Sequence, residues 1–305
     1  MERVNSEIQD ALAGVVASVR TPFTRNGDID FAGLRKYIDF IVDAGSRVAI
    51  LTYGDSLFSL LTSAEILEVT KVVRDQTANR IPLCAATGIW PTKQTVAFAE
   101  TCRELGVDIL MVLPPDWGKS GSVDTLVSHY AAAAEVLPVM VVTNLFKLRG
   151  DAFGLKVVEE LFERVPGVVA VKDDVAGEFG RRLCSLVSDR MTVISGGQKR
   201  THLDLSAYGC AGHMSPYITF KPEIAHLYWK SISSGDYPAA AEIISNYEVP
   251  LFNHLMNCSG GFDAGLHGIY EIVGIYERWR RAPYENLNES EMEVLADVCR
   301  ELTIL

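Results

Sequence analysis

The chain has 305 residues, of which 48% are hydrophobic and 22% charged, proportions typical of a folded globular protein and not of a disordered one. Its formal net charge of −11 comes with no lysine or arginine cluster longer than a pair, which argues against nucleic acid as a partner. The N-terminus has no signal-peptide pattern, no apolar run reaches membrane-spanning length, and the six cysteines are widely spaced. We therefore expect a cytoplasmic protein with reduced thiols, without a membrane partner, a metal or a cofactor.

Short β-rich apolar runs alternate with amphipathic helical stretches over most of the chain. This pattern predicts a parallel sheet built from strand-helix units, and the near-continuous apolar character suits strands buried on both faces. Eight such units predict one (β/α)8 TIM barrel. The expected strands cover residues 15–19, 48–52, 82–86, 109–113, 139–143, 168–172, 192–195 and 212–215.

Helices are expected between the strands, for example over residues 31–44 and 63–76, the second after a capping pattern at Thr62. Beyond residue 222 the pattern is helical only. We predict a barrel domain over residues 14–222 and a C-terminal helical extension over 223–305 that packs on it, since no flexible linker separates them. Helices of this extension are expected over 223–231, 237–257, 264–277 and 290–301.

Lys172 ends the sixth expected strand, after four apolar residues. Catalytic residues of such barrels lie at the C-terminal ends of strands, where loss of hydration favours a neutral amine. A neutral lysine can attack a ketone and form an iminium that withdraws electrons from a neighbouring bond. Asp173 and Asp174 would instead favour the ammonium if their carboxylates pointed inward, so a simple strand-end ion pair is the structural alternative.

The loop after the second strand reads Thr52-Tyr53-Gly54-Asp55. Two hydroxyls and an accessible backbone on a tight loop suit the binding of a substrate carboxylate. An ordinary turn between strand and helix is the alternative interpretation.

Taken together, the strand-end motifs resemble the dihydrodipicolinate synthase and N-acetylneuraminate lyase superfamily of pyruvate-dependent class I aldolases. The resemblance runs from about Gly14 to Pro222, and the order of the motifs makes it more specific than any one of them. They are Thr21-Pro22-Phe23 with Gly27, Ile29 and Asp30; Thr52-Tyr53-Gly54-Asp55 with Leu61, Thr62 and Glu65; Pro114-Pro115-Asp116-Trp117; Asn144; Val171-Lys172-Asp173; Ser195-Gly196-Gly197; and Gly209-Cys210-Ala211-Gly212-His213-Met214-Ser215.

The resemblance implies that Lys172 forms a Schiff base with pyruvate or a related 2-oxo acid. It also implies that Thr52 and Tyr53 hold the substrate carboxylate through hydroxyl and backbone donors, and that Asp55 stands where the family has glutamate. Gly54, on the same loop, is expected to bind the substrate as well. The remaining positions that it assigns to the substrate pocket are Asn144, Gly197 and Met214. Family members commonly form homotetramers from tight dimers, so we expect a homo-oligomer.

The departures from the family pattern bear on the reaction. The family has a proton-relaying tyrosine just before the asparagine, and here that position is Thr143, whose hydroxyl is much less acidic. We expect Thr143 to serve at most as a weak replacement, and we hypothesise that the phenol gained at Tyr53 partly takes over the relay. Trp117 and Leu148 replace a second tyrosine and an arginine, with Arg149 one residue later, so the lysine-biosynthetic reaction is not expected.

Three functions follow as hypotheses. The first is a Schiff-base-forming lyase or aldolase that makes or breaks a C–C bond next to a 2-oxo acid, or dehydrates a deoxy sugar acid. The second is a catalytically impaired barrel that binds a small oxo acid as a sensor or scaffold. The third is a metal-dependent barrel that would draw on His129, His202, His213 or His267 with nearby acids such as Asp204. Among these histidines only His213 falls at an expected strand, so no cluster is expected at the barrel mouth.

Overall fold

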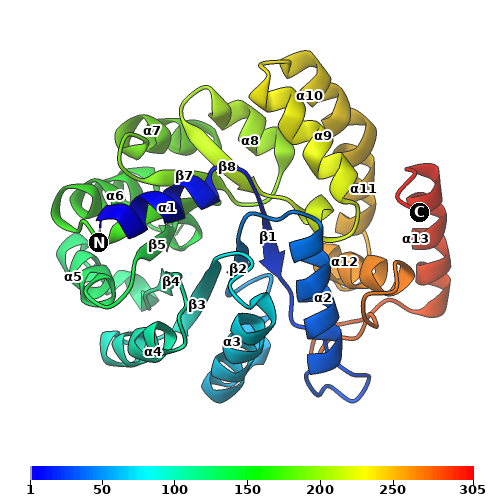
Figure 1. Cartoon of the computed structure of the whole chain (residues 1–305), viewed down its shortest axis with the longest axis horizontal. Helices are drawn as coiled ribbons and strands as arrows, with labels where there is room; N and C mark the ends of the chain where they lie inside the picture. Colours follow the sequence, from blue (N-terminus) through cyan, green and yellow to red (C-terminus); the bar gives the residue numbers. More distant parts are fainter. Residues whose placement is uncertain (1, 147) are drawn as a thin grey trace.

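The computed structural model describes residues 2–146 and 148–305, apart from the side chains of residues 2–5 and Trp117. Eight parallel strands in this part of the chain close into a barrel in the order of the sequence, which confirms the predicted TIM barrel (Figure 1). The strands are β1 (Val15–Val19), β2 (Ala49–Leu51), β3 (Leu83–Ile89), β4 (Ile109–Leu113), β5 (Val139–Val142), β6 (Val168–Asp173), β7 (Thr192–Ser195) and β8 (Cys210–Met214).

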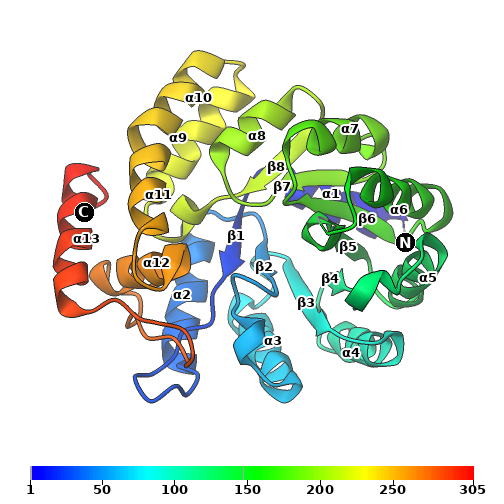
Figure 2. The same cartoon turned by 180° about the vertical axis from the view of Figure 1, so that it is seen from behind.

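A ring of helices surrounds the strands, and each helix follows its strand in the chain (Figures 1 and 2). These helices are α2 (Phe31–Asp43), α3 (Ser63–Thr77), α4 (Thr92–Glu104), α5 (Val123–Ala134), α6 (Asp151–Arg164), α7 (Gly177–Val187), α8 (Lys199–Ser206) and α9 (Pro222–Ser233). Because α9 follows β8 as the other helices follow their strands, it completes the ring. The division of the chain at residue 222 stays a prediction.

An N-terminal helix, α1 (Glu2–Leu12), was not anticipated from the sequence. The side-chain amide of Gln9 donates to the backbone carbonyl of Arg190, just before β7 begins. The carbonyl of Leu12 lies where a side chain on Gly212 of β8 would have to stand. Helix α1 therefore covers the end of the barrel opposite to the one where the strands finish.

Of the C-terminal helices, α10 (Tyr237–Ile243) packs beside α9, α12 (Gly261–Ile272) lies beside α2, and α13 (Glu289–Glu301) packs on α12 at the edge of the molecule (Figures 1 and 2). The helix expected over 237–257 is continuous but irregular, because a π-helical turn, η5, precedes Pro250, which has no N–H to continue the α-helical ladder. The helix expected over 264–277 ends earlier, and Gly274 follows it with a φ of 78°. Between α10 and α12 lie η5 (Ile244–Glu248) and α11 (Val249–Met256).

Arg281 ties the C-terminal segment to the barrel. Its Nη2 lies 2.8 Å from Oε1 of Glu65, the residue that completes the expected capping box with Thr62 at the start of α3. The hydrogen bond from Arg281 lowers the pKa of Glu65 to about 2, so the pair stays charged over the physiological range. None of the described helices has the length and apolar character needed to cross a membrane.

Acidification should destabilise this fold, because buried histidines must gain protons on unfolding. Burial lowers the pKa of His202 from 6.5 to about 4, and it lowers the pKa values of His213 and His267 well below 6.5. For His202 the stabilising contribution is complete above pH 6.5 and is lost as the pH falls to about 4, by about 3 kcal/mol. His213 and His267 change the stability in the same direction. Urea unfolding at a series of pH values measures this loss.

A phenylalanine at position 213 provides the matched variant. The His213 ring stacks on His202 and Trp229, and neither of its nitrogens has a hydrogen-bond partner in the described part of the chain. His213→Phe should keep the stacking and flatten the pH dependence, and His254→Gln, at a half-buried position outside this stack, is the control for removing a histidine. An unchanged slope in His213→Phe would show that His213 does not contribute.

Candidate active site

The strand ends of the barrel enclose a cavity of about 380 Å³, called the mouth cavity below. It receives Lys172 from β6, and apolar walls come from Met111 of β4 and Val142 of β5. Six of the residues that the sequence assigned to the site line it together: Thr52, Tyr53, Gly54, Asp55, Asn144 and Lys172. Segments that lie far apart in the chain thus meet at one point, as expected for parallel strands in a closed barrel.

Lys172 is 6% exposed, and its Nζ donates to both carboxylate oxygens of Asp174, at 2.5 and 2.6 Å. The contact is that of an ammonium with a carboxylate inside the barrel mouth. Of the two aspartates that follow the lysine, only Asp174 reaches its amine. Both members of the pair line the mouth cavity, so the pair borders the space that a substrate would occupy.

Asp173 is fully buried and turned away from Lys172. Its carboxylate accepts hydrogen bonds from the Thr143 hydroxyl at 2.8 Å and from the backbone amides of Val175 and Ala176 at 3.0 and 3.1 Å. Burial raises the pKa of Asp173, while these three donors act in the opposite direction. The carboxylate therefore shapes the turn after β6, in which Ala176 has a φ of 66°.

Thr143 begins the short 3-10 helix after β5, contacts the turn after β6, and is not among the residues that line the mouth cavity. Its hydroxyl donates to Asp173 and accepts from the backbone N–H of Asp174 at 2.9 Å. A threonine hydroxyl has one hydrogen to donate, and here Asp173 receives it. The catalytic role expected for Thr143 stays a prediction. Its hydrogen bonds stabilise the turn that carries Asp174.

The loop after β2 is held by hydrogen bonds that leave its inner side open. The Thr52 Oγ1 accepts from the Asp55 N–H at 2.9 Å, and the Ser56 hydroxyl accepts from the Thr52 N–H at 2.9 Å. Apart from the two chain neighbours of Gly54, no heavy atom of the described residues lies within 4 Å of where a side chain on Gly54 would begin. Thr52, Tyr53 and Gly54 therefore offer hydroxyl and backbone donors to the mouth cavity, as a carboxylate would require.

Gly197 and Met214 lie outside the mouth cavity. Gly197 has a φ of 142° and lines a neighbouring cavity of about 410 Å³, which shares Asp55 and Gly196 with the first. Met214 is buried at the end of β8. The two cavities adjoin, so Gly197 remains beside the site, and the substrate contacts expected for both residues stay predictions.

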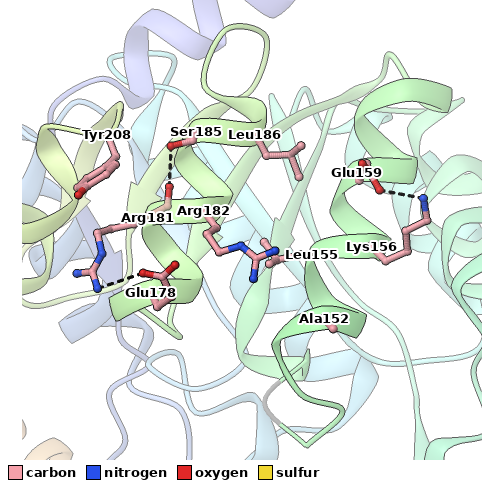
Figure 3. Close-up of a pocket in the computed structure, with 10 residues that line it drawn as sticks. All are labelled: Ala152, Leu155, Lys156, Glu159, Glu178, Arg181, Arg182, Ser185, Leu186 and Tyr208. Atoms are coloured by element: carbon pink, nitrogen blue, oxygen red, sulfur yellow. Dashed lines mark hydrogen bonds and ion pairs between the residues drawn. The ribbon is translucent and has the colours of Figure 1, made fainter.

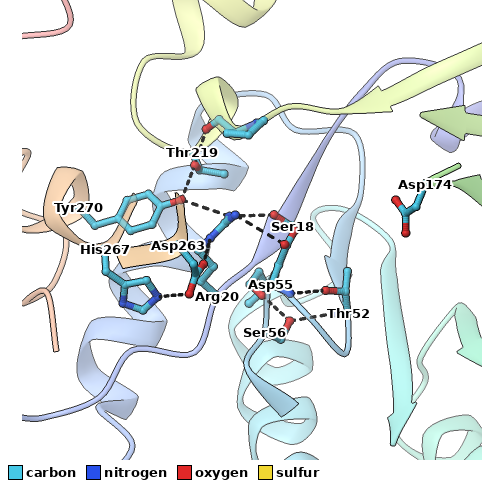
Figure 4. Close-up of polar contacts among 12 residues, drawn as sticks. Ser18, Arg20, Thr52, Asp55, Ser56, Asp174, Thr219, Asp263, His267 and Tyr270 are labelled. Atoms are coloured by element: carbon cyan, nitrogen blue, oxygen red, sulfur yellow. Dashed lines mark hydrogen bonds and ion pairs between the residues drawn. The ribbon is translucent and has the colours of Figure 1, made fainter. Parts of the chain in front are cut away.

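Arg20, at the end of β1, is the charged residue of the barrel mouth that the sequence did not single out (Figure 4). It is 2% exposed and donates from Nε to Asp263 at 3.3 Å and from Nη1 to Ser18 and Tyr270 at 2.9 and 3.3 Å. Its Nη2 lies 3.8 Å from Asp55. A charge directly after an apolar strand was the available signal, but two of its partners, Asp263 and Tyr270, lie more than 240 positions along the chain.

Leu148, at the position of the family's arginine, and Arg149 beside it do not line the mouth cavity. Leu148 is 88% exposed. Arg149 donates to Asp116 at 2.5 Å and to the Gly121 carbonyl at 2.9 Å, and its guanidinium lies over the Phe153 ring. It is thus tied to the loop after β4, and the Trp117 side chain lies outside the described residues.

A larger cavity, of about 690 Å³, lies between α6 and α7 on the outside of the barrel (Figure 3). Four of its charged side chains pair with one another: Lys156 contacts Glu159 at 2.8 Å, and Arg181 contacts Glu178 at 3.5 Å. No residue that the sequence assigned to the site lines it. Within residues 2–146 and 148–305 no three His, Cys, Asp or Glu side chains converge as metal ligands.

Comparison with known proteins supplies the relatives of this chain. The model of the dihydrodipicolinate synthetase family matches residues 11–302. A 4-hydroxy-tetrahydrodipicolinate synthase of Methanospirillum hungatei is 27% identical, with 93% of this chain and 97% of that protein covered. A 5-dehydro-4-deoxyglucarate dehydratase of Pseudomonas putida is 25% identical, with 95% of each chain covered.

Solved structures share the fold at lower sequence identity. Dihydrodipicolinate synthase from Oceanobacillus iheyensis superposes with a TM-score of 0.85 at 17% identity, covering 99% of this chain and all of that one. A prophage protein from E. coli K12, solved in complex with pyruvate, has a TM-score of 0.82 at 20% identity, with coverages of 96% and 99%. Since the family model spans nearly the whole barrel and the C-terminal helices, the chain belongs to the dihydrodipicolinate synthetase family of lyases.

Proposed function

We propose that the protein is a Schiff-base-forming lyase that acts on pyruvate or a related 2-oxo acid through Lys172. The observation that carries this proposal is one lysine amine that borders the mouth cavity, together with a loop of hydroxyl and amide donors. A 2-oxo acid needs both, because its ketone must meet the amine while its carboxylate is held beside it.

The chemistry follows from the iminium. After the amine has displaced the ketone oxygen as water, the positively charged nitrogen draws electrons from a neighbouring bond. Either a C–C bond is broken or formed at the adjacent carbon, or a hydroxyl group leaves further along the chain. Thr52, Tyr53 and Gly54 would hold the carboxylate, Asp55 and Asn144 would contact the rest of the substrate, and the Tyr53 phenol would assist proton transfer.

Between the reactions named for the two relatives, we favour the dehydration of a deoxy sugar acid or a related aldol reaction. The synthase reaction is less suitable, because position 148 is an exposed leucine and Arg149 is bound to Asp116 on another loop. We also propose a homo-oligomer, a dimer or tetramer, which light scattering of the purified protein would measure.

The decisive test is covalent capture. Incubation with pyruvate and borohydride should add a stable reduced pyruvyl group, and peptide mapping should place it on Lys172. Other 2-oxo acids, including deoxy sugar acids, should be tried in parallel. A folded sample left unmodified by every one of them would contradict the proposal.

A sensor or scaffold that binds an oxo acid is the second candidate, favoured by the absence of a phenol at position 143 and by the engagement of the Thr143 hydroxyl with Asp173. Ligand binding alone raises the unfolding temperature. Stabilisation by an oxo acid without product from any substrate would support this candidate, and turnover of one substrate would exclude it.

A further inference from the structure

We propose that Asp174 is the acid–base catalyst of the site and carries protons between the Lys172 nitrogen and the substrate. This inference rests on the proposed Schiff-base chemistry and adds a residue to it. Its basis is the contact of both Asp174 oxygens with the Lys172 Nζ, at 2.5 and 2.6 Å, in a cavity that both side chains line. A general base must lie within hydrogen-bond reach of the proton that it accepts, and Asp174 does.

The turn after β6 places Asp174 in this position. Asp173 is fixed in the opposite direction by Thr143 and two backbone amides, and the same Thr143 hydroxyl accepts the N–H of Asp174. Thr143 occupies the position where the family pattern has its tyrosine. Thr143, which has no phenol, thus orients the turn that brings the Asp174 carboxylate to the Lys172 nitrogen.

Gly196 at the end of β7 makes room for the Asp174 carboxylate. A β-carbon at position 196 would stand 1.7 Å from Asp174 Oδ1, so no larger residue fits while Asp174 holds this position. Asp174 keeps 19% of its side chain exposed, and it borders a second cavity of about 250 Å³ beside the mouth cavity. The carboxylate can therefore exchange protons with solvent between turnovers.

A pair with a purely structural role would be placed differently. Both charges lie at the cavity, where their desolvation opposes their attraction, and such a pair stabilises a fold little compared with apolar side chains. In the described part of the chain, the Asp174 carboxylate makes its hydrogen bonds and its ion pair with Lys172 alone. The pair is thus disposed to be opened by a substrate.

The proton transfers balance. Asp174 takes one proton from the Lys172 ammonium, and the freed lone pair forms a C–N bond with the ketone carbon while the C=O π electrons move to oxygen. Asp174 returns the proton to that oxygen. It then takes a second proton from nitrogen and gives it to the hydroxyl, which leaves as water when the C=N bond forms, and Asp174 ends as a carboxylate.

The test compares rates of imine formation in the full-length protein, with pyruvate as the probe and borohydride quenching at set times. Asp174→Asn and Asp174→Ala should form the adduct at least about 100-fold more slowly than the unaltered protein. Acetate added to Asp174→Ala should restore much of the rate, since a free carboxylate can enter the vacated space. Asp189→Asn, an exposed position on the loop after α7, is the control and should react at the original rate.

The outcomes separate the two proposals. Absence of any adduct in the unaltered protein would contradict the Schiff-base function itself. If the unaltered protein forms the adduct and Asp174→Asn forms it at the same rate, only the acid–base role of Asp174 would be overturned. A slow Asp174→Ala variant that acetate does not rescue would likewise overturn it, because the carboxylate would then act by positioning Lys172.

Discussion

Replacing Lys172 by methionine is expected to abolish covalent capture of 2-oxo acids and to lower turnover by at least about 10⁴-fold. Methionine fills a similar volume without a nucleophile, and the unpaired Asp174 keeps access to water, so the fold should survive. Peptide mapping after borohydride treatment measures capture, and a product assay measures turnover.

Lys172→Arg sharpens this prediction, because arginine retains the positive charge beside Asp174 but not the nucleophilic amine. It should be as inactive as Lys172→Met while restoring the ion pair. If both variants still form the reduced adduct, another lysine must be the nucleophile, which would contradict the proposed site.

Lys199 is the lysine to examine in that event. Burial lowers the pKa of Lys199 to about 8, so part of its amine is neutral near physiological pH. Its Nζ, however, is enclosed between Glu248 at 3.4 Å and the Tyr217 ring at 4.0 Å, and it lines neither the mouth cavity nor the neighbouring one. Glu248 also accepts the backbone N–H groups of Lys199 and Arg200 at the start of α8, which gives the ion pair a structural purpose.

The barrel could be predicted because its strands are apolar on both faces, a property that the sequence displays directly. The ends of the strands were harder to predict where polar residues are buried. Strand β3 extends to Ile89, beyond the expected residue 86, and the Thr87 hydroxyl is satisfied there by the backbone N–H of Leu113 on β4. Such a bond between strands has no local signature. Helix α1 is stabilised by contacts with distant strands and was missed for the same reason.

The site was predictable at the level of strand ends and not at the level of side-chain direction. Lys172 and the Thr52 loop lie together because parallel strands of a barrel finish at one end. Which of the two following aspartates faces Lys172 depends on the turn fixed by Thr143, and no property of the residues alone distinguishes Asp173 from Asp174.

The distant partners of Arg20, Asp263 and Tyr270, could not be predicted from the sequence either. Of the substitutions proposed here, replacement of Arg20 should lower stability the most. Arg20→Met is expected to lower the free energy of unfolding by about 3 kcal/mol, since it leaves the half-buried carboxylate of Asp263 without its nearest cation. Burial raises the pKa of Asp263, and Arg20 opposes that shift. In Arg20→Met the pKa of Asp263 should therefore rise further.

A carboxyl whose folded pKa lies above its unfolded value stabilises at low pH and loses that contribution as the pH rises through the folded pKa. The deficit of Arg20→Met should accordingly be larger at pH 7 than at pH 4. Urea unfolding at both pH values measures it, and Arg35→Met, which breaks an exposed pair with Asp75, should change stability by less than about 0.5 kcal/mol.

The double variant Arg20→Met with Asp263→Asn tests the cause. If the cost comes from a carboxylate left without its partner, removing that charge should recover most of the lost stability, and the two effects should not add. Additive losses would instead assign the cost to packing around the Arg20 side chain. Arg20 also lies 3.8 Å from Asp55, which lines the mouth cavity. The rate of imine formation in the double variant would therefore show whether the positive charge at position 20 contributes to the reaction.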